Sequence, residues 1–299
     1  MDRFEERRIN VAGTDTRIVV CDKQGAPATL FLHGGIPGVT PYCSGAHIWN
    51  GYLHSFQNRT LIVPDLPGSG GTIQGSQPLT MDTMGQHVFG LLSALSLDTV
   101  DVVGHDLGGL IGVWMGLSEP SRVRSLSIVA SPMCPPAADG LDNILLASPP
   151  QPLWSRESQA WAFERLSLVH THIDEPFLDT CVAASRGVAH GKAISYMKEN
   201  YARTFAPSMT RVRNRLWDAC RNRGLQVPTQ IVWASHDPAT SRESGMVLFN
   251  AIAGQQQASQ IHIVNRSGSF PFREQPAAFS HIVASFEDAI LDQHSPAGC

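Results

Sequence analysis

Apolar and β-branched residues recur along the chain in short runs that longer amphipathic segments separate. Such runs are typical of strands that are buried on both faces of a parallel sheet. The predicted strands span residues 16–22, 28–34, 60–68, 99–106, 123–132, 229–237 and 259–265. The predicted helices between them include residues 81–96, 107–119 and 276–290. This alternation predicts an α/β fold, in which a doubly wound and mostly parallel sheet carries helices on both faces.

The alternation of strands and helices is interrupted in the middle of the chain. From residue 133 to 227 the pattern is helical, and no segment favours a strand. We therefore predict an α/β core formed by residues 1–132 and 228–299, with a helical cap at 133–227. Aromatic residues of the cap, among them Tyr196 and Tyr201, are candidates to line a substrate pocket.

Composition limits the partners that we expect. The 299 residues carry a formal net charge of -4 and no run of Lys or Arg, which argues against nucleic acid and anionic membranes as partners. No segment resembles a signal peptide or a membrane span, so the expected location is cytoplasmic. We expect a small-molecule substrate, and the sequence leaves open whether the chain forms a homo-oligomer.

The six cysteines show no CxxC or CxxH spacing. This scatter indicates free thiols rather than a zinc site or a disulfide framework. We expect the protein to work without a metal or a cofactor.

The segment Gly104-His105-Asp106-Leu107-Gly108 follows a predicted strand and opens a predicted helix. Glycines two positions before and after Asp106 let the backbone turn sharply, which raises the central side chain above the carboxyl end of the sheet. Amide groups at the start of the helix point to the same place, so the Leu107 N–H can stabilise an oxyanion. Asp106 is therefore the candidate catalytic residue.

The loop His33-Gly34-Gly35-Ile36 closes an earlier predicted strand. Its small residues allow the N–H of Gly35 or Ile36 to complete an oxyanion hole together with the Leu107 N–H. We call the turn at Asp106 the nucleophile elbow. His33 is also a candidate for contact with the substrate.

With these motifs the chain resembles the α/β-hydrolase superfamily. The segments that carry the likeness are HGG at 33–35, PDLPGSGGT at 64–72, GHDLGG at 104–109, IVWASHD at 231–237 and RSGSFPFREQP at 266–276. The resemblance implies that Asp237 is the acid after the late strand. It also implies a catalytic histidine at the position where this chain has Ser269, between Gly268 and Phe270.

Two branches of the superfamily share features with this chain. Aspartate at the elbow is similar to dehalogenases and epoxide hydrolases, in which the carboxylate attacks carbon and histidine-activated water cleaves the resulting ester. The GGIPG loop, with Trp49 further on, resembles hydrolases that cleave carbon–carbon bonds in ring-cleavage products, but those carry serine at the elbow. The nucleophile favours the first branch.

Details of that branch match less well. Leu107 stands where haloalkane dehalogenases have a tryptophan that binds the halide and fluoroacetate dehalogenases have an arginine. Epoxide hydrolases use two cap tyrosines, and Tyr196 and Tyr201 are the candidates here, although a spacing of five residues separates them around a helix. Trp49 and His105 complete the candidate substrate contacts, while a histidine in the position of His105 tends to point into the sheet.

The missing histidine leaves three functions open. Our first hypothesis is hydrolysis of the epoxide hydrolase or dehalogenase type with Asp106 as nucleophile, because a carboxylate is ionised at neutral pH. The alternative is a lyase, isomerase or cyclase that uses Asp106 and Asp237 as acid–base groups, since one of two neighbouring carboxylates has a raised pKa. The third is a catalytically silent protein that binds a small molecule. In each case Ser269 could hold a substrate or a water by hydrogen bonding.

Overall fold

The computed structural model describes residues 4–53, 56, 58–136 and 145–294. One sheet of eight strands runs through it in the order β1-β2-β4-β3-β5-β6-β7-β8. The strands are β1 (Glu5–Val11), β2 (Thr14–Cys21), β3 (Ala28–Leu32), β4 (Thr60–Pro64), β5 (Val100–His105), β6 (Val123–Val129), β7 (Thr229–Ala234) and β8 (Gln260–Val264). Each predicted strand is present, and β1 is an additional strand that the apolar pattern does not indicate.

Strands β3 to β8 run parallel, whereas β1 and β2 form an antiparallel hairpin and β2 pairs antiparallel with β4. Every residue of β3, β4, β5 and β7 is buried. Near-continuous apolar sequence is what strands covered on both faces require, because helical crossovers lie over each side of a parallel sheet. The prediction of a doubly wound, mostly parallel sheet is therefore confirmed.

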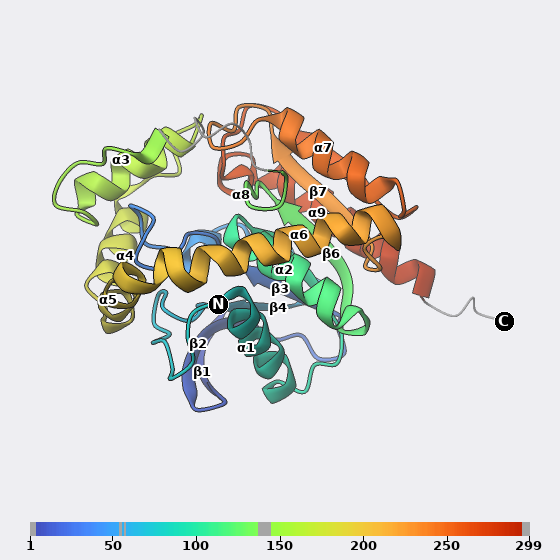
Figure 1. Ribbon diagram of the computed structural model, residues 1–299, viewed down its shortest axis with the longest axis horizontal. Coiled ribbons are helices and arrows are strands. Elements are labelled where there is room, and N and C mark those ends of the chain that lie inside the picture. The colour runs from blue at the N-terminus through green and yellow to red at the C-terminus, as the bar shows by residue number, and fades with distance from the viewer. Residues whose placement is uncertain (1–3, 54–55, 57, 137–144, 295–299) are drawn as a thin grey trace.

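Helices cover both faces of this sheet (Figure 1). They are η1 (Ala46–Trp49), α1 (Met81–Ala94), α2 (Leu107–Ser118), η3 (Pro120–Arg122), α7 (Arg242–Ala253), α8 (Pro271–Glu274) and α9 (Pro276–His294). Helices α1, α2 and α7 share one core with strand residues such as Leu30 and Val102. Helices η1 and α9 share the other core with Phe31 and Val103, the next residue along each strand. Alternation along the strands therefore supplies two cores, one on each face.

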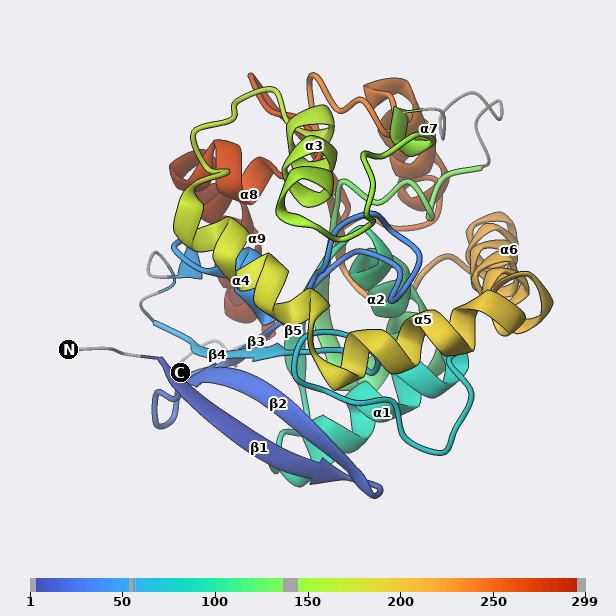
Figure 2. The same cartoon turned by 90° about the vertical axis from the view of Figure 1, so that its left-hand side faces the viewer.

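The chain between β6 and β7 contributes a set of inserted helices. They are α3 (Arg156–Leu166), α4 (Glu175–Ser185), α5 (Val188–Asn200), the π-helix η5 (Tyr201–Phe205) and α6 (Ala206–Asn222). This region corresponds to the predicted cap at 133–227, of which residues 137–144 lie outside the described residues. Figure 1 shows α3, α4 and α5 gathered at one end of the molecule, and Figure 2 looks onto that end with these helices in front of the strands.

Close backbone contacts hold the inserted helices against loops that follow the strands. A Cβ on Gly38, in the loop after β3, would lie 2.5 Å from the Ile194 nitrogen of α5. A Cβ on Gly268, after β8, would lie 2.4 Å from the Leu166 oxygen at the end of α3. Both glycines are needed because the helix backbone occupies the space of a side chain. The inserted helices thus face the carboxyl end of the sheet, where the sequence places the elbow.

Among the described residues, no helix combines the length and the apolar character that crossing a membrane requires. The described cysteines are free and buried; they are Cys21, Cys43, Cys134, Cys181 and Cys220. Cys299 lies outside the described residues. Over the same part of the chain, no group of at least three His, Cys, Asp or Glu side chains is arranged to hold a metal ion.

Candidate active site

Asp106 occupies a sharp turn between β5 and α2. Its backbone has φ 50° and ψ -114°, a conformation that costs energy for a residue with a side chain. A Cβ on Gly104 would lie 2.3 Å from the Gly108 oxygen, and one on Gly108 would lie 2.3 Å from the Leu32 oxygen. The turn therefore requires both glycines, as the nucleophile-elbow motif predicts. Ser131 stabilises this turn, because its hydroxyl donates a hydrogen bond of 2.6 Å to the Asp106 carbonyl.

The Asp106 carboxylate lies against backbone N–H groups from two loops. Gly35 donates its N–H to Oδ2 of Asp106 at 2.7 Å, and the Leu107 N–H is a second backbone donor to the carboxylate. A Cβ on Gly34 would lie only 2.5 Å from the Asp106 Cβ, so this loop approaches the elbow as closely as glycine allows. Of the two predicted loop donors, the Gly35 N–H makes the contact with Asp106. In the same loop, the Ile36 carbonyl accepts hydrogen bonds from the N–H groups of Val39 and Thr40.

Asp237 follows β7, and its two carboxylate oxygens have different surroundings. Oδ1 accepts a hydrogen bond of 2.6 Å from the Ser269 hydroxyl and one of 2.9 Å from the Ala239 N–H. Oδ2 is buried and has no hydrogen-bond partner among the described residues. A buried acceptor without a partner costs about 1–3 kcal/mol, and such atoms call for an explanation in function or bound water.

Ser269 lies in the loop between β8 and α8, where its side chain reaches Asp237. Its N–H donates to the Leu166 carbonyl at 2.7 Å, and its carbonyl accepts from His105 Nε2 at 2.9 Å. Its side chain is buried and directed at Asp237. The Ser269 hydroxyl is thus a direct side-chain partner of the Asp237 carboxylate.

Both carboxyl groups have raised pKa values. Burial raises the pKa of Asp106 to about 6, against the opposing effect of the Gly35 and Leu107 N–H groups. Asp106 keeps some accessible surface although protein atoms surround its carboxylate. Burial raises the pKa of Asp237 to about 7, the Ser269 hydroxyl opposes this, and the Asp106 charge adds to it. Among the described residues, no Lys or Arg is a main cause of either shift.

Two of the predicted substrate contacts are committed to packing. The His33 ring accepts the Leu66 N–H at Nε2, 3.0 Å away, and its Nδ1 lies 2.8 Å from the Gly34 oxygen. Burial also lowers the pKa of His33, which favours the neutral ring. Trp49 has no exposed surface and its ring centroid lies 4.1 Å from that of Phe272. These positions give both residues packing roles in place of the substrate contacts that we expect from the sequence.

His105 points away from the elbow, into the core. Its Nε2 donates to the Ser269 carbonyl, and its ring lies 5.1 Å from Phe270 and 5.0 Å from Phe272. Burial lowers the pKa of His105 to about 3, so the ring is neutral at physiological pH. His105 therefore links the elbow to the Ser269 loop and acts as a structural residue.

The predicted tyrosine pair has packing contacts in the structure. Tyr196 and Tyr201 are half-buried and pack against the core that α1 and α2 share. The Tyr201 ring stacks on Phe205 with centroids 6.3 Å apart. The convergence of the two hydroxyls on one substrate oxygen stays a prediction.

Tyr42 lies beside the candidate site, and no sequence motif predicts it there. Its ring packs on Phe163 of α3, with centroids 4.8 Å apart, and its Cε2 lies 3.4 Å from the position of a Cβ on Gly35. Burial raises the pKa of Tyr42 well above its usual value, and the charges of Asp106 and Asp237 raise it further. The phenol thus lies in the field of both carboxylates, a placement that arises from tertiary packing and has no motif.

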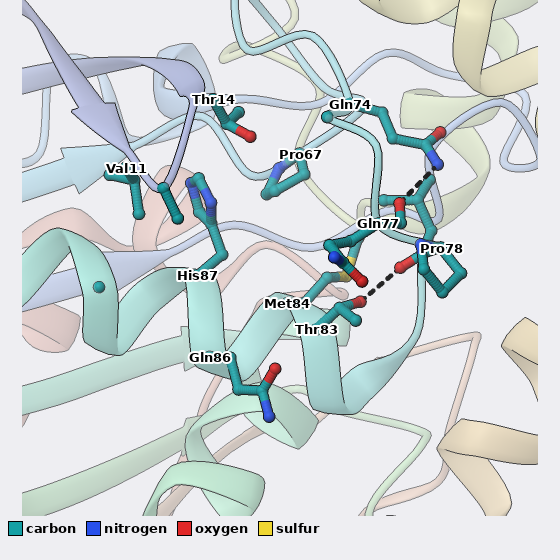
Figure 3. Close-up of a pocket in the computed structure, with 14 residues that line it drawn as sticks. Val11, Thr14, Pro67, Gln74, Gln77, Pro78, Thr83, Met84, Gln86 and His87 are labelled. Carbon is teal, nitrogen blue, oxygen red and sulfur yellow. Dashed lines mark hydrogen bonds between the residues drawn. The ribbon is translucent and has the colours of Figure 1, made fainter.

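A separate pocket of about 160 Å³ lies between the β1–β2 turn and α1 (Figure 3). His87 points toward Val11 and Thr14 across it, and the His87 Nε2 lies 3.0 Å from the Thr16 hydroxyl. Its lining includes none of the predicted catalytic residues. We therefore place the candidate active site at the elbow.

Comparisons with known proteins agree with this geometry. A model of the alpha/beta hydrolase family matches residues 29–282. The 2-hydroxymuconate semialdehyde hydrolase of Pseudomonas sp. strain CF600 is 24% identical over 288 residues, covering 94% of this chain and 93% of that protein. The 2-hydroxy-6-oxo-2,4-heptadienoate hydrolase of Pseudomonas putida strain F1 is 27% identical over 273 residues, covering 88% of this chain and 89% of that protein.

A solved meta-cleavage product hydrolase from Pseudomonas fluorescens IP01 has the same fold, with a TM-score of 0.75 and 19% identity. The match covers 95% of this chain and 97% of that structure. The family model spans most of the sequence, and the sheet and elbow described above are those that its fold requires. This chain therefore belongs to the alpha/beta hydrolase family and is an enzyme of the hydrolase superfamily.

Proposed function

We propose that this enzyme hydrolyses a small, uncharged electrophile, such as an epoxide or an alkyl halide, through an ester on Asp106. The observation that carries this proposal is the hydrogen bond of 2.7 Å from the Gly35 N–H to Oδ2 of Asp106. A carboxylate held in the oxyanion site by one oxygen attacks carbon with the other, and the carbon–halogen bond or the ring carbon–oxygen bond breaks to release halide or to leave an alkoxide on the substrate. The ester carbonyl then already faces the donors that stabilise the tetrahedral intermediate when water attacks.

The charges of the site favour a neutral substrate. Asp106 and Asp237 are both acidic, and no described Lys or Arg is among the main influences on the pKa of either. An anionic substrate would meet repulsion in a poorly solvated site, where charges interact strongly. The two Pseudomonas relatives have names that denote oxo-acid or semialdehyde substrates. The acidic elbow of this chain supports a different, uncharged class.

The test is intact-protein mass spectrometry after incubation with a panel of neutral epoxides and alkyl bromides, followed by mapping of the modified peptide. The proposal expects a mass increase on the peptide that contains Asp106. In Asp106→Ala, turnover should fall by at least about 10⁴-fold, the scale seen when a nucleophile is removed. Unchanged turnover in this variant would exclude Asp106 as nucleophile.

A second candidate is acid–base chemistry without an ester, such as elimination or isomerisation. It is favoured by the raised pKa values of about 6 for Asp106 and about 7 for Asp237, which suit proton transfer near neutral pH. The same panel, extended with β-dicarbonyl compounds, separates the two. Turnover that Asp106→Ala abolishes, with no trapped or transient adduct, supports this second candidate.

A further inference from the structure

We propose that Asp237 is itself the general base of the second step, accepting a proton from the attacking water at Oδ2, and that Ser269 is its positioning residue. This inference rests on the proposed ester on Asp106. It assigns to the late carboxylate the proton transfer that an imidazole would otherwise perform, rather than the orientation of such an imidazole.

The two oxygens of Asp237 differ in their contacts, so one can fix the carboxylate while the other accepts a proton. Ser269 and Ala239 both donate to Oδ1, at 2.6 and 2.9 Å, and so fix the plane of the carboxylate. Oδ2 is left buried with no partner of hydrogen-bond geometry among the described residues, although the Thr240 N–H also lowers the pKa of the group. An acceptor that is held in place and unpaired is ready to receive a proton.

The histidines near the carboxylates are engaged elsewhere. His105 donates Nε2 to the Ser269 carbonyl, and burial lowers its pKa to about 3, which makes it a poor base. Both nitrogens of His33 contact backbone groups. His236, although next to Asp237 in sequence, is exposed and lies 2.7 Å from the Ser235 hydroxyl through Nδ1. Asp237, whose pKa the Asp106 charge raises, is therefore the described carboxylate placed to act on the ester.

The proton balance closes with these two carboxylates. Water adds to Cγ of the Asp106 ester, one of its protons passes to Oδ2 of Asp237, and negative charge develops on Oδ2 of Asp106. The bond from Cγ to Oδ1, the oxygen that attacked the substrate carbon, then breaks, and the leaving alkoxide, which carries Oδ1, takes the proton from Asp237. The products are an alcohol and the Asp106 carboxylic acid, which loses its proton to solvent above its pKa of about 6.

The environment of Asp237 sets its pH range. The titratable groups that face it are Asp106 of the elbow, whose charge raises the pKa of Asp237, and Tyr42, whose own pKa Asp237 raises. The Ser269 hydroxyl acts in the opposite direction, because a donor to the charged form stabilises it. Removal of that hydroxyl should therefore move the pH dependence of ester hydrolysis to higher pH.

The experiment follows the decay of the Asp106 ester by time-resolved mass spectrometry after excess epoxide or alkyl bromide is removed. The proteins are the parent, Asp237→Asn, Ser269→Ala and, as a matched amide control, Asp292→Asn, which alters an exposed side chain of α9. Thermal unfolding confirms that each variant is folded. We expect Asp237→Asn to form the ester and to clear it about 10²- to 10⁴-fold more slowly, the usual contribution of a general base.

The remaining outcomes separate the two proposals. Ser269→Ala should clear the ester with a profile displaced to higher pH, and Asp292→Asn should match the parent. Clearance by Asp237→Asn at the parental rate across the pH range would overturn the role of Asp237, as would a parental ester that never clears. Absence of any ester in the parent, with turnover that survives Asp106→Ala, would instead reject the proposed function and the role of Asp237 with it.

Discussion

The backbone N–H of Gly35 and Oδ2 of Asp106 are 2.7 Å apart, which joins the loop after β3 to the turn after β5. The contact depends on the preceding Gly34, because a side chain there would meet the Asp106 Cβ at 2.5 Å and the Asp106 Oδ2 at 2.8 Å. The geometry of the site is thus fixed by backbone groups, and it is sensitive to a single methyl group.

Gly34→Ala should therefore damage both stability and activity. Overpacking of this kind typically costs about 1–3 kcal/mol, and displacement of the Asp106 carboxylate should lower the rate of ester formation. The matched control is Gly191→Ala on α5, where a Cβ would meet nothing within 4 Å. That variant should be as stable as the parent or up to about 1 kcal/mol more stable. Denaturant unfolding measures both, and a Gly34→Ala protein of parental stability would contradict the close approach.

Asp106→Asn should stabilise the protein more at pH 8 than at pH 4. Burial raises the pKa of Asp106 from 3.8 to about 6, so the folded state holds this proton more tightly than the unfolded chain. The stability that the group contributes is present below pH 4 and is lost as the pH rises through 6. The amide keeps an oxygen for the Gly35 N–H and removes the titration. Thermal unfolding at the two pH values, with Asp292→Asn as control, checks this, and an equal shift at both would contradict it.

Tyr42→Phe should lower the rate on epoxides more than on alkyl bromides. Within the part of the chain that the structure describes, the Tyr42 hydroxyl makes no hydrogen bond, so it is free to donate one to an oxygen that forms when a ring opens. Loss of such a bond costs about 1–3 kcal/mol, a factor of about 5 to 150 in rate. A departing halide needs this donor less. Comparison of kcat/KM for the two substrate classes tests the prediction, and equal losses would indicate a packing role alone.

Ser269→His should accelerate clearance of the Asp106 ester. The imidazole would accept the proton of the attacking water and donate its other N–H to the Asp237 carboxylate, whose charge would stabilise the protonated ring. General-base assistance contributes about 10²- to 10⁴-fold, which bounds the expected gain. The measurement is the single-turnover decay of the ester in the parent and the variant. A slower decay would show that the buried position near Leu166 has no room for the ring.

The sequence predicts best those features that local backbone geometry dictates. The elbow at Asp106 needs glycines at fixed positions, and the buried strands need unbroken apolar runs, so both are readable from the chain. Strand β1 is not readable in this way. Six of its seven residues keep some exposure, with charged side chains at Glu5, Glu6, Arg7 and Arg8, so it has no apolar stripe to reveal it.

Features that depend on packing between distant segments are harder to predict. Tyr42 reaches the site because Phe163 of α3 and Phe270 of the late loop pack on its ring, and neither spacing nor motif connects them. Tyr196 and Tyr201 were plausible pocket residues by type and region, yet α5 and η5 turn them toward the core. The hydrogen bond between Ser269 and Asp237 lies between these cases, because the family pattern aligns the two positions and only the structure shows the contact.

The most direct test of covalent catalysis is a single turnover in water labelled with oxygen-18, with the enzyme in excess over a neutral epoxide that it turns over. If Asp106 attacks carbon, the first product carries the unlabelled oxygen of the Asp106 carboxylate, and the peptide that contains Asp106 gains the label when water cleaves the ester. Covalent catalysis by Asp106 predicts that result. A labelled product together with an unlabelled Asp106 peptide would show that water attacks the substrate directly, and would exclude an ester on Asp106.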